Sequence, residues 1–399
     1  MGRAVGGETM NLREAFMASK LLGGEGGGAA TIQPLSISAN GEYTVPEGVD
    51  GFSPVTVSVP ASAVVSGTVQ LSENGTFDVT QYANAEVNVS GGGGGGDTEL
   101  YESIIDGTIS GSVVLNVNGL GPGALMTRHI EALNLPNATY ISTSALYYCL
   151  SLTAVSMPSV LQVGNSAFGS CSKLQNVYAP ELTSVGASAF AYCSSLASIV
   201  LSSNPVLDTA AFGYCKSLSI FPALSTMTSI GSRAFTGTAL SSVNCPNVEY
   251  IGNSAFSNCS ELLYASFPKY QSTLIDTFYS CSKLASVYIP LVSSMSQAFR
   301  GCRLLASLRF DSVNRIGNYT FYDCRSLSAL YIFDVNVPSL QNVNAFSSTP
   351  MSDSTYIGTF GSIYVRASLL ESYKTAAIWS AYSARMVGLT DEEIAALNA

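Results

Sequence analysis

A chain of 399 residues with 47% hydrophobic and only 11% charged residues can bury a large core, and its polar surface must come mainly from Ser, Thr, Asn and Gly. Its formal net charge of −10, with 17 Lys and Arg, argues against binding to a nucleic-acid phosphate backbone, which requires a concentrated basic face. No apolar run is long enough to span a bilayer, and residues 1–30 lack the apolar h-region of a secretory signal. We therefore expect neither a nucleic-acid partner nor membrane insertion.

Two glycine-rich stretches divide the N-terminal part of the chain. One ends the segment of residues 1–30, and the other places six consecutive glycines within residues 91–97. Such runs are too flexible to belong to a packed element, so we interpret them as linkers. The sequence predicts that residues 31–90 fold separately from the remainder of the chain.

Residues 31–90 contain two copies of a short β pattern, each with an Asn-Gly pair between alternating apolar residues (Asn40-Gly41 and Asn74-Gly75). Asn-Gly is the strongest short-range hairpin signal, because a type I′ turn requires positive φ at both central residues. The sequence therefore predicts two β-hairpin modules, one built from residues 37–45 and 55–59 and the other from residues 71–79 and 87–89.

A block of the form Ala-Phe-x-x-Cys recurs through the second half of the chain. Its cysteines are nearly always 22 residues apart: Cys149, Cys171, Cys193, Cys215, Cys259, Cys281, Cys302 and Cys324. Self-similarity at this period indicates one supersecondary unit per repeat, stacked on its neighbours to form a continuous core. The predicted fold class is a mainly β solenoid over residues 127–349, preceded by an N-terminal cap over residues 98–126.

Each repeat has two apolar segments besides this block. A leucine follows the cysteine at the third position and an apolar residue comes three further on, as in Leu174 and Val177. The second half of the repeat has Val or Ile before Gly, as in Val163-Gly164. We expect the glycine to permit the corner of the coil and the Ala-Phe pair to fill its interior.

Residues 350–399 have a different character and predict a short helical C-terminal cap. Ser368 with Glu371 and Thr390 with Glu393 both fit the capping box, in which hydroxyl and carboxylate satisfy free backbone N–H groups at a helix start. Trp379, the only tryptophan, is expected in the core of this cap.

The repeat, Leu-x-x-Ile-x-x-Pro followed by Ile-Gly-x-x-Ala-Phe-x-x-Cys, resembles the BspA-like class of leucine-rich repeats over residues 127–349. Proteins of that class are known for surface attachment and for binding to matrix, cells or other proteins, and none of their motif residues is catalytic. The resemblance implies an adhesion protein without enzymatic activity.

The Asn-Gly modules and the lead segment of residues 11–22 resemble parts of tail and baseplate proteins of bacteriophages that infect gut bacteria. This resemblance implies that the N-terminal region attaches to other tail or baseplate proteins and that the chain belongs to a virion. A bacterial cell-surface location is the alternative, with an export route that the sequence does not show.

The sequence predicts no cofactor or metal. One cysteine per coil could form a ladder, but buried cysteines pack as small hydrophobes, and paired Cys-x-x-Cys spacing for zinc is absent. The single histidine, His129, has no partner motif for hydrolysis, so we interpret it as a structural or surface residue. Gly119-x-Gly121-x-Gly123 is interpreted as a turn, because no βαβ pattern comes after it.

A polysaccharide depolymerase is the enzymatic alternative, since glycosidases need only two carboxylates about 5–10 Å apart. The outward strand positions of the repeats contain none, and carboxylates such as Glu181, Glu249, Asp276 and Asp311 fall in turns or on another face. A catalytic pair at a rim is not predicted by any pattern.

Outward strand positions on the expected concave face supply the candidate ligand-binding residues. Their tyrosines and arginine would form an aromatic stripe bordered by Ser and Asn, suited to stacking on sugars or anchoring a protein. The alternative is that tyrosine only serves as a good strand former. The candidate residues are Asn176, Tyr178, Asn244, Tyr264, Tyr288, Arg309 and Tyr331.

These observations favour a non-enzymatic phage tail or baseplate appendage whose solenoid binds a protein or glycan of the host cell surface. The alternatives are a bacterial cell-surface adhesin and a purely structural virion protein in which the solenoid is a spacer.

Overall fold

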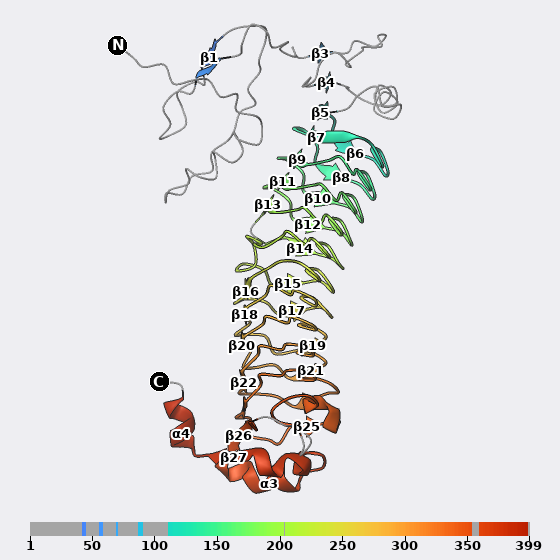
Figure 1. Ribbon diagram of the computed structural model, residues 1–399. Coiled ribbons are helices and arrows are strands. Elements are labelled where there is room, and N and C mark those ends of the chain that lie inside the picture. Colours follow the sequence, from blue (N-terminus) through green and yellow to red (C-terminus); the bar gives the residue numbers. More distant parts are fainter. Residues whose placement is uncertain are drawn as a thin grey trace, which may run out of the picture.

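The computed structural model describes residues 42–44, 56–58, 69–70, 87–90, 111–202, 204–352 and 359–397. From residue 111 onward the chain winds into a column of stacked coils, most of them with two short strands, and a helical segment closes the C-terminal end (Figure 1). The predicted solenoid with its period of about 22 residues is confirmed, because Val177 lies in register with Val155 and with Ile199.

The strands of the first row contain the apolar residue that lies three positions after the leucine of each repeat, such as Val177 after Leu174. These strands run parallel to one another, so each coil adds one rung to a sheet. The strands are β5 (Gly111–Asn116), β7 (Ile130–Asn134), β9 (Ala154–Ser156), β11 (Asn176–Tyr178), β13 (Ser198–Val200), β16 (Ser242–Asn244), β18 (Tyr264–Ser266), β20 (Ser286–Tyr288), β22 (Ser307–Phe310), β24 (Ala329–Ile332), β26 (Ser362–Arg366) and β27 (Met386–Leu389).

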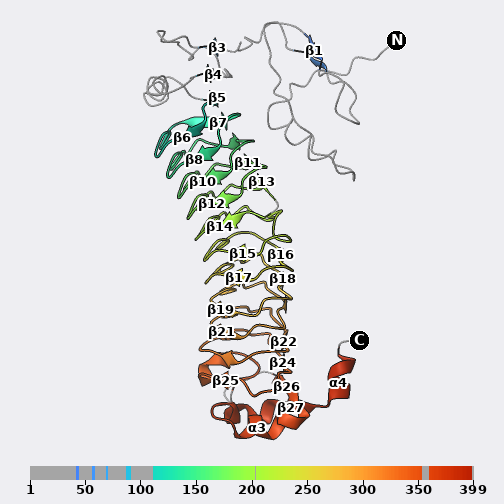
Figure 2. The ribbon, with the colours of Figure 1, turned by 180° about the vertical axis from the view of Figure 1, so that it is seen from behind.

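The second strand row precedes the Ala-Phe block and lies along the other side of the column (Figure 2). Its short strands also pair in parallel from coil to coil. They are β6 (Gly119–Leu120), β8 (Tyr140–Ile141), β10 (Gln162–Val163), β12 (Ser184–Val185), β14 (Val206–Leu207), β15 (Ser229–Ile230), β17 (Tyr250–Ile251), β19 (Thr273–Ile275), β21 (Ser294–Ser296), β23 (Arg315–Ile316) and β25 (Ser339–Leu340).

The interior of the column contains a ladder of phenylalanine rings, as the Ala-Phe block predicts. Rings of neighbouring coils stack with centroids 5.0 Å apart at Phe168–Phe190 and up to 5.9 Å apart at Phe212–Phe235. Each ring is fully buried. The members are Phe168, Phe190, Phe212, Phe235, Phe256, Phe278, Phe299, Phe321 and Phe346.

The cysteines form a second buried ladder. The thiol of each repeat cysteine donates to a carbonyl oxygen of the preceding coil, with Sγ···O distances of 2.9 Å at Cys149 and 3.0 Å at Cys281. All nine cysteines, including Cys245, are buried and free of disulfides, so the core interpretation is confirmed. In the coil without a cysteine, Thr238 takes this place and donates to the carbonyl of Phe235 at 2.9 Å.

The glycine after the second strand has a different role from the one predicted. The left-handed backbone positions are those two residues before the Phe and one before the Cys, such as Ser166 (φ 54°) and Ser170 (φ 62°). At Gly252 a Cβ would clash with the backbone nitrogen of Ser232 on the preceding coil. Glycine is therefore required there because neighbouring coils approach closely.

The C-terminal cap consists of short helical segments between and after the last strands of the first row. They are η1 (Val343–Phe346), η2 (Ala367–Leu369), α3 (Leu370–Thr375), η3 (Trp379–Arg385) and α4 (Asp391–Ala396). The capping box of Thr390 and Glu393 is confirmed by both of its hydrogen bonds. The one predicted at Ser368 is wrong: Ser368 lies within η2, and α3 begins without a side-chain cap.

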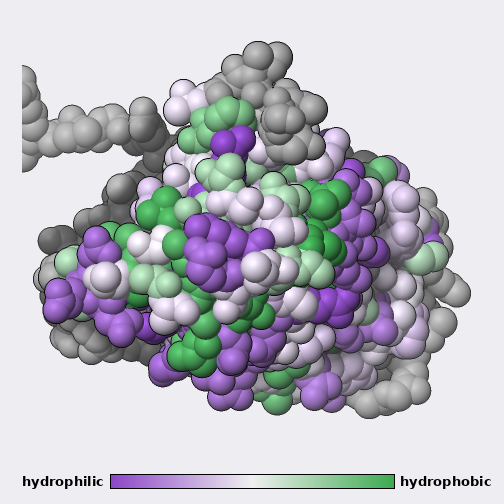
Figure 3. All heavy atoms as spheres, turned by 90° about the horizontal axis from the view of Figure 1, so that it is seen from below, coloured by the Kyte–Doolittle hydropathy of each residue, from purple (hydrophilic) through white to green (hydrophobic). Residues whose placement is uncertain are grey.

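Trp379 closes the hydrophobic column, as predicted. Its side chain is 1% exposed, and its Nε1 donates to the carbonyl of Pro338 at 2.7 Å. The indole packs against Phe346, the last rung of the phenylalanine ladder, and against Tyr373 of α3. Viewed from this end, hydrophilic residues are interleaved with hydrophobic ones over the cap (Figure 3).

Four short strands are described before residue 111. β1 (Glu42–Thr44) pairs antiparallel with β2 (Thr56–Ser58), and β4 (Val87–Ser90) runs parallel to β3 (Val69–Gln70) and to β5. The two Asn-Gly turns and the glycine run of residues 91–97 lie outside the described residues, so the predicted domain boundaries stay predictions.

The phenylalanine ladder predicts a large effect of removing one rung. Phe256→Ala should lower the free energy of unfolding by about 3–5 kcal/mol, because the ring is buried between two others and its removal leaves a cavity. Denaturant unfolding of the full chain measures this. Tyr250→Ala, at an exposed position on β17, is the control and should change stability by less than about 0.5 kcal/mol. Equal effects of the two substitutions would contradict a stabilising role of the ladder.

The buried thiols predict that the protein loses stability at alkaline pH. Burial raises the pKa of Cys245 to about 12 and raises the pKa of Cys215 further. An unfolded thiol titrates near about 8.5, so above that pH the folded state binds more protons and the free energy of unfolding falls.

One pH unit above about 8.5, each such thiol should remove up to about 1.4 kcal/mol. Denaturant midpoints measured from neutral pH upward test this expectation. A Cys245→Ala variant, which lacks one titrating group, should show a shallower decline. Stability that is independent of pH in this range would contradict the prediction.

Candidate binding surfaces

The outward side of the first strand row, called here the first-row face, contains the predicted site residues. In β11 the outward residues Asn176 and Tyr178 flank the buried Val177, and the same alternation recurs along the row. Tyr288 and Tyr264 are the most exposed predicted tyrosines, at 52% and 40%. Asn244 is exposed as well, whereas Asn176, Tyr178, Arg309 and Tyr331 are half-buried.

The structure does not bring all of these residues into one stripe. The sheet that contains β11 ends at β13, and residues 216–228 form no strand before the next sheet begins at β16. Exposed Ile220 lies in this interval, and exposed Val200 is the last residue of β13. Asn176 and Tyr178 are therefore separated along the row from Asn244 and the later residues. Sequence spacing could not show this break, because the period itself continues through it.

A contiguous aromatic row exists near the C-terminal end of the first-row face. Arg309, Tyr331 and Tyr364 occupy the same register position on β22, β24 and β26. The rings of Tyr331 and Tyr364 stack with centroids 4.6 Å apart. The pKa of Tyr331 is raised, mainly by burial and to a smaller extent by the neighbouring Tyr364. Tyr364 was missed from the sequence because it comes after the last repeat, although the alternation of Ile363, Tyr364 and Val365 already indicates a strand.

Arg309 is held in place within this row. Its Nε donates to Oδ1 of Asp311 at 2.8 Å, and its guanidinium lies 5.0 Å from the ring centroid of Phe333. These contacts orient the side chain and partly neutralise its charge. The row therefore presents ring faces and a pre-oriented cation, which can stack on and hydrogen-bond to a partner.

A second arginine packs among tyrosines at a corner of the coils. The guanidinium of Arg300 lies 5.2–5.5 Å from the ring centroids of Tyr279, Tyr319 and Tyr322, and its Nη1 donates to Oε1 of Gln297 at 3.0 Å. Tyr279, Arg300 and Tyr322 are each the residue after the ladder phenylalanine in three successive coils. These contacts hold the corners of the three coils against one another.

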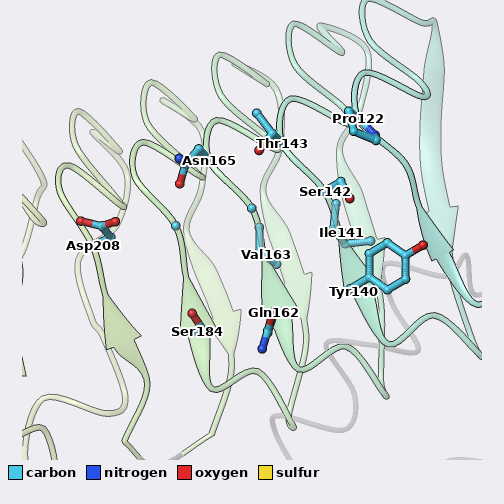
Figure 4. A pocket seen from close by; sticks show the side chains of 12 residues that line it. Pro122, Tyr140, Ile141, Ser142, Thr143, Gln162, Val163, Asn165, Ser184 and Asp208 are labelled. Atoms are coloured by element: carbon cyan, nitrogen blue, oxygen red, sulfur yellow. The ribbon is translucent and has the colours of Figure 1, made fainter.

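The second strand row borders an open groove near the N-terminal end of the column (Figure 4). Its volume is about 480 Å³, and its lining comes from β8, β10 and β12, from the corners that follow them, and from the residues after β6 and β14. The polar or aromatic side chains in the lining include Tyr140, Thr143, Gln162, Asn165, Ser184 and Asp208. None of the sequence-predicted site residues lies in it.

A second groove, of about 750 Å³, lies further along the column and includes Glu249 and Lys269 in its lining. Lys269 donates to Oδ1 of Asn247 at 3.2 Å. Each groove has a single carboxylate, Asp208 or Glu249. Neither offers the carboxylate pair that glycoside hydrolysis requires.

Other groups with catalytic potential are scattered along the column. His129 is exposed, and its Nδ1 lies 3.4 Å from Oγ of Ser151 on the next coil. Within residues 111–202, 204–352 and 359–397, no cluster of three or more His, Cys, Asp or Glu side chains could hold a metal ion. The helices in that part of the chain are too short and polar to cross a membrane.

A column of two-stranded coils with leucine, phenylalanine and cysteine ladders defines a leucine-rich repeat solenoid. The chain belongs to the BspA type leucine-rich repeat family: the family model, described as a BspA type leucine rich repeat region, matches residues 139–263 and 265–367, more than half of the chain. The predicted family resemblance of the repeats is thereby confirmed. Members of this family are repeat scaffolds and are typically non-enzymatic.

Solved structures of other leucine-rich repeat proteins resemble the chain in part. A protein from Bacteroides ovatus is 17% identical, covers 89% of this chain and 100% of its own, and gives a TM-score of 0.42. The T. pallidum leucine rich repeat protein is 28% identical over 45% of this chain and 79% of its own, with a TM-score of 0.34. A leucine rich cell surface protein from Faecalibacterium prausnitzii is 17% identical over 90% and 100%, with a TM-score of 0.32. No curated protein matches the chain.

Proposed function

We propose that the protein is a non-enzymatic adhesion protein that binds a cell-surface protein or glycan through its first-row face. The observation that carries this proposal is the exposed Tyr288 followed by Arg309, Tyr331 and Tyr364 along one face of a rigid column. Tyrosine offers a large contact area at low conformational-entropy cost, and Ser and Asn beside it supply hydrogen bonds.

Family membership supports this kind of function. BspA-like repeat proteins attach to surfaces, and the single carboxylate in each groove gives no support to a depolymerase. The bacterial cell surface is the location that family membership favours. The solenoid would then act by holding its outward residues at fixed spacing for a partner on another cell or in the surrounding matrix.

A phage tail or baseplate appendage is the second candidate. The specific observation in its favour is the pair of Asn-Gly modules in residues 31–90, which resemble segments of phage tail proteins. In that case the N-terminal region would attach to other tail proteins and the solenoid would bind the host surface. A purely structural spacer would also be located in the virion, but it would not bind the host surface.

The first-row face predicts that two tyrosines dominate attachment. The double variant Tyr288→Ser and Tyr331→Ser should lose at least about tenfold in binding of the labelled full chain to gut bacterial cells, because both aromatic rings are removed. Two quantities are measured: the saturable retention of the chain on the surface, which reports binding, and the release of reducing sugar, which reports enzymatic activity. Tyr250→Ser, on the second strand row, is the matched control.

Full retention by the double variant would reject the first-row face as the binding surface. Release of reducing sugar by the unaltered chain would contradict a non-enzymatic function. Absence of retention on every surface would leave the structural role as the better explanation.

A separate prediction concerns where the protein is located. Immunogold labelling with an antibody against residues 127–349 should decorate the surface of intact producing cells if the protein is a bacterial adhesin. Labelling confined to the tails of purified phage particles would reject that location and establish the second candidate.

A further inference from the structure

The groove along β8, β10 and β12 is a built feature of the second strand row. Buried Ile141 and Val163 anchor its strands, and Gly164 and Gly186 leave only backbone in the lining between polar side chains. Both glycines are required, because a Cβ would lie 2.7 Å from the backbone of Ser142 or 2.6 Å from Oδ1 of Asn165. The hollow is therefore a consequence of the way the coils pack.

One end of the groove is an aromatic platform. Tyr140 is 46% exposed, and its ring lies against the backbone of Gly119 on the preceding coil, where an added Cβ would come within 2.5 Å of ring carbons. The backbone thus supports the ring on one side. Figure 4 shows the ring at one end of the row of lining side chains and the carboxylate of Asp208 at the other.

The other end contains a departure from the repeat. Asp208 comes after β14 at the position where neighbouring coils have Gly186 and Gly231. Its Oδ1 accepts a hydrogen bond from the backbone N–H of Thr209 at 2.6 Å, which orients the carboxylate. Ser142 and Ser296 also occupy this register position in other coils, so the position accepts a side chain, and at Asp208 that side chain is charged.

Between these ends the groove offers neutral hydrogen-bonding groups. Gln162 and Asn165 contribute amides, and Thr143 and Ser184 contribute hydroxyls. The Oδ1 of Asn165 accepts from the backbone N–H of Ala187 at 2.9 Å, so its amide plane is fixed. Lys and Arg are absent from the lining, and Asp208 is its only charge.

We propose that this groove binds a neutral oligosaccharide that runs along the axis of the solenoid. An aromatic face stacks on the apolar face of a pyranose ring, while amides, hydroxyls and a carboxylate bind sugar hydroxyls. Four coils spaced by about 4.8 Å place the two ends about 14 Å apart, the length of a short sugar chain. The single acid disfavours an acidic glycan, and the shallow polar floor lacks the apolar pockets that peptide side chains fill.

The site is separate from the first-row face, and the proposal does not depend on that face. Tyr140 and Asp208 lie on or next to the second strand row, whereas Tyr288 and Tyr331 lie on the first. A protein that attaches through the first-row face could hold a glycan here at the same time.

Calorimetric titration of the full chain with linear neutral β-linked glucose and N-acetylglucosamine oligosaccharides of increasing length tests the proposal. Affinity should rise with chain length until the sugar reaches from Tyr140 to Asp208 and then stop rising. Tyr140→Ala and Asp208→Asn should each weaken binding about tenfold, because one removes the stacking platform and the other the charged acceptor.

Three controls separate the possible results. Tyr250→Ala removes a tyrosine at the equivalent position of β17, outside the groove, and should leave affinity unchanged. The double variant Tyr288→Ser and Tyr331→Ser should also bind the sugar normally, which distinguishes this site from the first-row face. Circular dichroism and denaturant midpoints establish that each variant is folded.

The proposal is overturned if sugar binding is unaffected by both Tyr140→Ala and Asp208→Asn in folded variants. It is also overturned if no neutral oligosaccharide binds, if oligogalacturonate binds more tightly than its neutral counterparts, or if only peptides bind.

Discussion

The parallel, in-register stacking of one coil on the next is the constraint on which the rest of the structure depends. Because Val155, Val177 and Ile199 lie at the same register position, equivalent residues form ladders along the axis. Each rung then contacts a copy of itself, which explains the stacked phenylalanines and the thiols that donate to the preceding coil. The glycines that follow the second strand belong to the same constraint, since at Gly164, Gly231 and Gly252 the preceding coil lies too close for a Cβ.

The ladders use few residue types, and their interactions are satisfied from coil to coil. Thr238 replaces a cysteine and also contacts the next coil: its Oγ1 lies 3.4 Å from Sγ of Cys259, while its hydroxyl donates to the carbonyl of Phe235 in its own coil. Nearest-neighbour contacts of this kind make stability nearly a sum over coils, which is why both ends need closing. Trp379 performs this task at the C-terminal end by covering the last phenylalanine.

The period and the buried positions could be predicted from the sequence, because one residue type recurs at each inward position. The strands carrying Tyr178 and Tyr288 are predicted by the same alternation. The interruption after Val200 could not be predicted, since a coil without a strand keeps the period. Nor could the groove of Tyr140 and Asp208, because it joins residues 68 positions apart and the strands beside it are only two residues long.

Function in such a column is carried by residues that the ladders do not determine. Outward positions contribute little to packing, so tyrosine, serine or glutamine can occupy them without disturbing the register. Asp208 lies at the register position of Gly186 and Gly231, where Ser142 and Ser296 show that a side chain can be accepted. Its carboxylate borders a hollow with an aromatic ring at the opposite end. The proposed oligosaccharide would give this carboxylate a function that the packing of the coils does not require.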